Sequence, residues 1–261
     1  MFRFRTAQEL IHWLEVGTGA RWIRRAAVVV GTLALSLLIS RAQFHGPLSE
    51  TTLLQADTGR QIARGKGFTT LVNTPQTAAF LAMRGTKFDP AQPYPELHQA
   101  PLYSLAIAGA LRLLPEAKRE ALFISAPVPP DGFAGDYLLL GLNLVLLWLA
   151  AWLTYHLACR LFDPQTGWLA ALALLVSVSV WQQTVAVNGM PLLMVLALVA
   201  FWIWQRIDLA AEQSARAALP WVPALGAACG LLFLAEYSAG ALALVALGYV
   251  AWRFSGSGRW L

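Results

Sequence analysis

The sequence predicts an all-α polytopic membrane protein, a helical bundle of about six spans with a large external first loop. Of its 261 residues, 57% are hydrophobic and only 13% are charged, whereas soluble domains carry roughly 25% charged residues. The apolar residues gather in stretches that a water-soluble core of this size could not bury. We therefore expect the lipid bilayer to be the chain's main partner.

Residues 1–25 are expected to form a cytoplasmic interfacial helix. Within residues 6–16, leucine, isoleucine and tryptophan lie near one side of a helix, and three arginines follow before the first apolar run. Residues 26–41 then form the first transmembrane span, lengthened by snorkelling arginines at both ends. A cleaved signal peptide is the alternative, but this segment lacks a convincing small-x-small cleavage site.

Residues 42–136 are expected to form the external loop, because eight basic and eight acidic residues fall within them. Inside this loop, residues 101–115 are apolar, bounded by prolines and shorter than a comfortable span. If they do not cross the bilayer, five later arginines share the side of the N-terminal ones: Arg160, Arg206, Arg216, Arg253 and Arg259. The positive-inside rule therefore favours a re-entrant or juxtamembrane helix and a cytoplasmic N-terminus. A bacterial inner membrane fits this orientation.

Residues 137–261 are expected to form a five-span bundle. The apolar segments are 137–159, 166–183, 189–206 and 219–252. The last one is long enough for a hairpin, and its polar centre, Glu236-Tyr237-Ser238, predicts a turn between spans 219–235 and 238–252.

A polar stripe begins the external loop. Four side chains share the i, i+3, i+4, i+7 face of a predicted helix: Asp57, Arg60, Gln61 and Arg64. Gly65 and Gly67 would end that helix. A carboxylate between guanidiniums is either a surface salt-bridge stripe or a general base beside anion-binding groups.

The motifs along the chain resemble those of the membrane glycosyltransferases of the GT-C fold. An Asp early in the first external loop precedes I-A-x-G-x-G-F at residues 62–68, and H-x-x-P-L-Y at 98–103 opens a membrane helix. Residues 155–162 (YHLACRLF) and 230–234 (GLLFL) resemble later parts of the family. The class includes protein O-mannosyltransferases and the aminoarabinose transferase acting on lipid A. We expect the chain to correspond to the N-terminal part of such an enzyme.

This resemblance implies transfer of a sugar from a polyprenyl-phosphate donor to an acceptor at the external face. It makes Asp57 the catalytic carboxylate that deprotonates or orients the acceptor hydroxyl. It places His98 near the lipid-linked phosphate and Tyr103 in the pocket wall. An acceptor hydroxyl needs a base, and a departing phosphate needs cations. Arg60, Arg64 and Lys66 are candidates for that second task, although contact with lipid headgroups is an equal alternative.

Two features depart from the family pattern. No second acidic residue stands beside Asp57, and Glu236 occupies a place where aminoarabinose-type enzymes carry a basic residue. Glu236 could therefore serve a different donor, a metal-assisted site or no catalysis. Cys159 and Cys229 form no metal-ligand pattern and no closed metal site is visible. We identify no cofactor, and dependence on a divalent cation stays open, as does the acceptor.

Other functional classes fit the sequence less well. A non-catalytic membrane subunit or scaffold is the main alternative, and it would work with a partner chain. A small transporter rarely devotes so long a loop to the outside, and no inverted repeat is visible. Nucleic acid binding is a poor explanation of the net charge of +5, because the excess basic residues lie at the ends of apolar runs.

Overall fold

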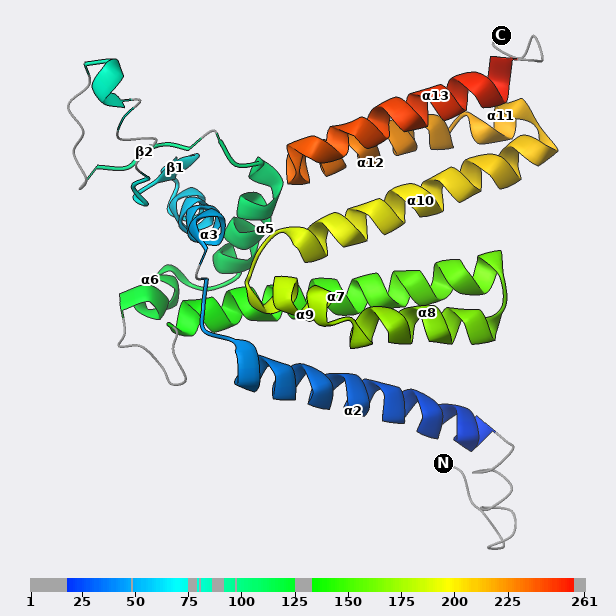
Figure 1. Ribbon diagram of the computed structural model, residues 1–261, viewed down its shortest axis with the longest axis horizontal. Helices are drawn as coiled ribbons and strands as arrows, with labels where there is room; N and C mark the ends of the chain where they lie inside the picture. Colours follow the sequence, from blue (N-terminus) through cyan, green and yellow to red (C-terminus); the bar gives the residue numbers. More distant parts are fainter. Residues whose placement is uncertain are drawn as a thin grey trace, which may run out of the picture. The chain divides into compact units, whose positions relative to one another are not determined.

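The computed structural model describes residues 18–47, 49–74, 79, 81–85, 92–96, 98–124 and 133–255. Its regular structure there is helical apart from two short antiparallel strands, β1 (Thr69–Thr70) and β2 (Tyr94–Pro95). The chain divides into two compact units, Met1–Phe44 and His45–Leu261. The predicted all-α fold class is therefore confirmed (Figure 1).

The first unit contains one long helix, α2, from Thr18 to Gln43, of which Ala26–Gln43 is apolar enough to cross a membrane. Two of its hydroxyls donate to carbonyls one turn earlier in the same helix, a common arrangement for such side chains in membrane helices. The Thr32 hydroxyl donates to the carbonyl of Val28 at 2.8 Å, and the Ser36 hydroxyl donates to that of Thr32 at 2.7 Å. Of residues 1–25, expected to form the interfacial helix, residues 1–17 lie outside the described residues, and residues 18–25 belong to α2.

The second unit contains the remaining apolar helices. They are α7 (Ala134–Leu161), α8 (Pro164–Val176), α9 (Val178–Val185), α10 (Met190–Gln213), α12 (Trp221–Ala235) and α13 (Ala241–Ser255), with a short α11 (Ala215–Ala218) and a 3-10 turn η1 (Tyr237–Gly240). Among the described residues, five helices including α2 are long and apolar enough to cross a membrane, or six spans result if α8 and α9 form one bent span. The turn predicted at Glu236 separates α12 from α13.

The segment predicted as one straight span at residues 166–183 is broken. The helices α8 and α9 meet at Ser177 with a bend of 54°. Ser177 has an extended backbone, with ψ 114°, and so interrupts the helical hydrogen bonds. The indole of Trp181 donates to the carbonyl of Leu175 at 2.6 Å, which satisfies one group that the break frees. The apolar pattern could not show this local break.

The bundle is packed largely through small and aliphatic side chains, as is common between membrane helices. A buried cluster joins α10 to α12; among its members are Ala200, Ile203, Ile207, Ala211, Leu225, Ala228, Cys229 and Leu232. At the α7–α8 contact, a Cβ added to Gly167 would lie 2.3 Å from the sulfur of Cys159. Both cysteines are free. Close helix approach therefore accounts for the small residues here.

The described residues before the bundle include the helices α3 (Glu50–Ala63), α5 (Pro101–Arg112) and α6 (Glu116–Ile124). The helix α3 begins at Ser49, whose side chain accepts from the N–H of Thr52. It ends where the sequence predicted, because Gly65 has a left-handed φ of +79°. The N–H groups of Gly65 and Lys66 bond back to the last turn of the helix and close a Schellman cap.

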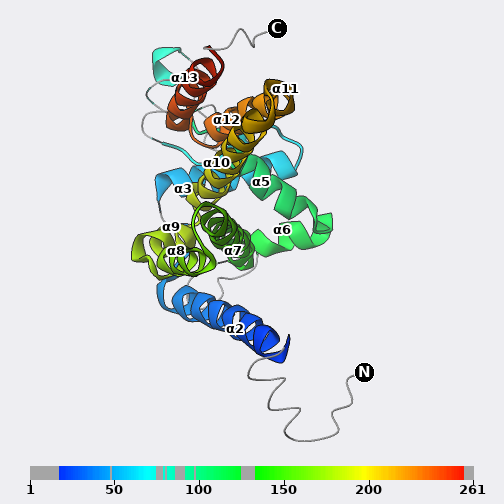
Figure 2. The same ribbon diagram turned by 90° about the vertical axis from the view of Figure 1, so that its right-hand side faces the viewer.

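The helices α3 and α5 lie side by side (Figures 1 and 2). Gly59 permits their close approach, because a Cβ there would lie 2.6 Å from Ile107 Cγ2 and 2.9 Å from the carbonyl oxygen of Ser104. The Ser104 hydroxyl donates to the carbonyl of Gln55 at 3.1 Å, and Arg112 donates to that of Ile62 at 2.8 Å. The two helices therefore form one rigid pair.

The helix α5 sits at the end of the bundle where α7 and α10 begin and α12 ends (Figure 1). Its Tyr103 reaches Asn143 of α7, and the Tyr237 hydroxyl donates to the carbonyl of Gln99, just before α5, at 3.2 Å. Twelve helical residues span about 18 Å, less than the roughly 30 Å of a bilayer core. This helix is not among those able to cross a membrane.

Replacement of Gly59 by alanine should destabilise the protein by about 1 to 3 kcal/mol, because the new methyl group would overlap Ile107 and backbone of α5. The matched control is Gly109→Ala on α5, where an added Cβ meets nothing within 4 Å. That change should be neutral or slightly stabilising, since alanine favours helix. Thermal unfolding of both variants in detergent measures the difference. Equal midpoints would refute the close contact.

Candidate functional site

Asp57 ties the helix α3 to the strand β1. Its Oδ2 accepts hydrogen bonds from the hydroxyl of Thr70 at 2.9 Å and from the N–H of Leu71 at 2.6 Å. No described residue donates to its Oδ1. The side chain is half-buried. One carboxylate oxygen is therefore held by the protein, and the other has no donor among the described residues.

The two strands connect Asp57 to the segment that holds His98. Thr70 pairs with Tyr94, and the N–H of Glu96 donates to the carbonyl of Phe68 at 3.0 Å. The buried Glu96 carboxylate then accepts from the N–H of His98 at 2.6 Å. The imidazole of His98 is exposed and makes no hydrogen bond to the described part of the chain. His98 is thus linked to Asp57 through backbone and not by direct contact.

Arg64 is neutralised by a residue that no sequence motif singled out. Its Nε donates to Oε1 of Glu120 on α6 at 2.8 Å, and Nη2 donates to Oε2, which makes the pair bidentate. The hydrogen bond to Glu120 raises the pKa of Arg64, and the same bond lowers the pKa of Glu120. Glu120 lies 56 residues further along the chain, so spacing gave no signal for this contact.

Arg60, one helical turn before Arg64, is held differently. Its guanidinium carbon lies 4.5 Å from the centre of the Phe123 ring, a cation–π contact. Its Nε is buried without a hydrogen-bond partner, and no salt bridge to a carboxylate is found for it among the described residues. Burial, followed by the charge of Arg64, lowers the pKa of Arg60. Arg60 therefore keeps a positive charge that no direct partner cancels.

Lys66 extends from the turn between the two left-handed glycines, Gly65 and Gly67. Its backbone N–H caps α3 by donating to the carbonyl of Gln61 at 3.0 Å. The residue is exposed, and no described carboxylate forms a salt bridge with it. It is a second cation near Asp57 in sequence that is free to meet an anion or a headgroup.

Tyr103 is fully buried, and its hydroxyl donates to Asn143 Oδ1 at 2.8 Å. Burial raises the pKa of its phenol. The Asn143 amide donates in turn to the carbonyls of Thr184 at 3.2 Å and Asn188 at 3.0 Å. These bonds enclose the turn at Val187, a buried residue with a left-handed φ of +56°. Tyr103 therefore links α5 to the bundle.

Glu236 ends α12 with an exposed side chain, and the hydroxyl of Ser238 lies 3.5 Å from its Oε1. The neighbouring Tyr237 bonds to Gln99, so this turn lies beside the His98 segment. The predicted site residues therefore fall into two groups. One group is carried by α3 and its cap, and the other by the start of α5 with the α12–η1 turn. Among the described residues, no hydrogen bond or salt bridge joins a side chain of one group to a side chain of the other.

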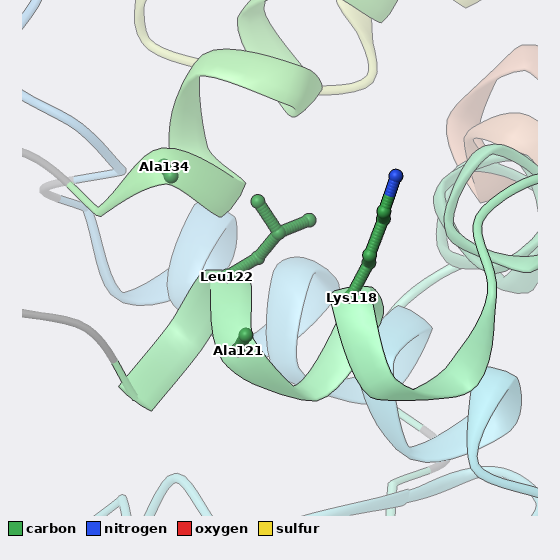
Figure 3. A pocket seen from close by; sticks show the side chains of 4 residues that line it. All are labelled: Lys118, Ala121, Leu122 and Ala134. Carbon is green, nitrogen blue, oxygen red and sulfur yellow. The ribbon is translucent and has the colours of Figure 1, made fainter.

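A shallow pocket of about 270 Å³ lies between α6 and the start of α7 (Figure 3). Lys118, Ala121, Leu122 and Ala134 line it. In Figure 3 the Lys118 and Leu122 side chains leave the same side of α6. None of the predicted site residues lines this pocket, so it does not enlarge the candidate site.

Comparison of the chain with known proteins identifies no family for it. The chain matches no protein-family model, no curated protein and no solved structure. Within the described ranges, no three His, Cys, Asp or Glu side chains are grouped to hold a metal ion. The charged side chains of α3 and their partners are therefore the features of this chain that bear on its function.

Replacement of Asn143 by alanine should destabilise the protein by about 2 to 4 kcal/mol, because it leaves one buried hydroxyl and two carbonyls without their partner. Tyr103→Phe should cost less, since only one bond is lost. The control is Gln182→Ala, an exposed change on α9 that should stay within about 0.5 kcal/mol. Unfolding midpoints for Asn143→Ala that equal the control's would contradict this network.

Proposed function

We propose that the protein is a membrane glycosyltransferase that passes a sugar from a polyprenyl phosphate to an acceptor hydroxyl on the external face. The observation that supports this most is that only one oxygen of the Asp57 carboxylate accepts hydrogen bonds from the described residues. Thr70 and Leu71 fix Oδ2, while Oδ1 has no donor among the described residues. Arg60 follows on the same helix with an uncancelled charge. A base beside a cation is what this transfer requires.

The proposed step balances as an inverting displacement. The acceptor oxygen attacks the anomeric carbon, and Oδ1 of Asp57 takes the hydroxyl proton. The bond between the anomeric carbon and the phosphate oxygen breaks, and polyprenyl phosphate leaves with the electron pair. Arg60 and Lys66 offset the charge that develops on the phosphate. Arg64 is paired with Glu120 and becomes available for this task only when that pair opens.

The distribution of arginines supports an external position for α3 and α5. Four of them lie toward the opposite end of the bundle: Arg160, Arg206, Arg216 and Arg253. The short turns at the α5 end, residues 186–189 and 236–240, carry no lysine or arginine. The positive-inside rule then makes the arginine end cytoplasmic. We extend this to a cytoplasmic N-terminus in a bacterial inner membrane, since arginines also stand near the start of α2.

A non-catalytic scaffold is the second candidate function. Asp57 already has a structural task in holding β1, and Arg64 is already paired. Such a protein would keep the bundle and its polar helices but would work through a partner chain. It predicts stable co-purification with that partner and no sugar transfer by the purified chain.

Replacement of Asp57 by asparagine should lower sugar transfer by about 10²- to 10⁴-fold, the usual contribution of a positioned base. The amide still accepts from Thr70 and Leu71, so the fold should survive. The chain is placed in proteoliposomes with radiolabelled polyprenyl-phosphate donors that carry a hexose or a pentose. The measurement is the release of polyprenyl phosphate from these donors.

The matched control is Asp163→Asn, which makes the same chemical change at the exposed N-cap of α8. Asparagine caps helices as well as aspartate, so this variant should turn over at the parental rate. Parental turnover by Asp57→Asn would remove Asp57 from the chemistry. Absence of turnover by the unmodified chain with every donor, together with a co-purifying partner, would favour the scaffold.

A further inference from the structure

The contact between α3 and α6 holds more positive than negative charge. The guanidiniums of three residues lower the pKa of Glu120; Arg64 has the largest effect, followed by Arg60 and Arg119. The negative charges of Glu120 and Asp57 in turn favour the charged forms of Arg60 and Arg64. Glu116 lies 3.9 Å from Arg119, but its side chain is 85% exposed and its charge is screened by water. The contact therefore has an excess cation, Arg60, with no carboxylate of its own.

The geometry of the Arg64–Glu120 pair is one that phosphate can also adopt. Two guanidinium nitrogens of Arg64 donate to the two carboxylate oxygens. The same fork of donors binds two oxygens of a phosphate group. A phosphate at Arg64 would in addition meet the positive charge of Arg60, one helical turn away. Glu120 forms no salt bridge with Arg60.

The pair is accessible enough to exchange. The side chains of Arg64 and Glu120 are 20% and 32% exposed, so water reaches both. Opening the pair need not detach α6, because Phe123 anchors that helix independently. Its ring lies under Arg60 and fills the space beside Gly135 of α7, where an added Cβ would come within 2.4 Å. Glu120 can therefore move while α6 stays in place.

We propose that Glu120 is a built-in competitor for a phosphate-bearing ligand, which binds across Arg60 and Arg64 by displacing the Glu120 carboxylate. The proposal rests on the proposed function only in expecting the phosphate to be that of a polyprenyl donor. A phospholipid headgroup offers the same chemistry. In either case Glu120 lowers the affinity of the site and so favours release of the phosphate after transfer.

The test is the affinity of the full chain for phosphate in nanodiscs of phosphatidylcholine. Glu120→Gln should bind polyprenyl phosphate, doped into the disc, about tenfold more tightly than the unmodified chain, since one charge-assisted pair no longer competes. Glu116→Gln is the matched control. It removes the same charge one turn away on α6, and we expect less than a twofold change.

A double variant tests whether the tighter binding of phosphate by Glu120→Gln depends on Arg64. Adding Arg64→Gln to Glu120→Gln should abolish the gain, because the freed donors are lost. Inorganic phosphate and discs doped with phosphatidic acid separate the sources of the ligand. A preference for polyprenyl phosphate assigns the site to the donor, and equal binding of phosphatidic acid assigns it to headgroups. Both results support the competition.

The proposal is overturned if Glu120→Gln binds phosphate no more tightly than Glu116→Gln while unfolding at the parental temperature. It is also overturned if Glu120→Gln unfolds earlier and binds more weakly, because Glu120 is then a tether that holds the site together. The readout is binding and not turnover. A chain that transfers no sugar can therefore still pass this test, and an active one can still fail it.

Discussion

The buried hydrogen bonds of Asn143 are the constraint on which the candidate site depends. A polar side chain inside a membrane bundle is tolerated only when its hydrogen-bonding groups are satisfied. Asn143 accepts from Tyr103 and donates to the carbonyls of Thr184 in α9 and Asn188 in the α9–α10 connection. Tyr103 belongs to α5, and α5 packs on α3 at Gly59. The buried Asn143 amide therefore helps to set the position of Asp57 relative to the bundle, together with the Tyr237–Gln99 hydrogen bond.

The helix α3 then divides its polar side chains among three neighbours. Asp57 holds the strand β1, Arg64 holds Glu120 of α6, and Arg60 stacks on Phe123. The first and third contacts leave groups without a hydrogen-bonding partner among the described residues: one carboxylate oxygen of Asp57 and the guanidinium Nε of Arg60. This arrangement can serve acid–base work next to an anion, and it lies at the end of the bundle opposite Arg160, Arg216 and Arg253. The same contacts explain why a merely structural role for α3 is the main competing account.

Local patterns predicted much of this fold, because they depend on neighbours in sequence. Apolar length located the spans, Gly65 marked the end of α3, and the prolines framed α5. The contacts that define the site are not local. Glu120 and Phe123 are single residues in an ordinary amphipathic stretch, and Asn143 is a lone amide in an apolar run. Only the packing of helices shows that they reach Arg64, Arg60 and Tyr103. The break at Ser177 depends likewise on one backbone angle.

The sidedness of the two bundle ends is the most direct test of the central claim, that α3 and its carboxylate face the outside. In a chain with Cys159 and Cys229 replaced by alanine, Met83→Cys places a thiol at an exposed position of the loop between β1 and β2, and Glu212→Cys places one near the end of α10. A membrane-impermeant thiol reagent added to intact cells should label position 83 and reach position 212 only after permeabilisation. Labelling of position 212 alone in intact cells would put Asp57 in the cytoplasm and contradict the account.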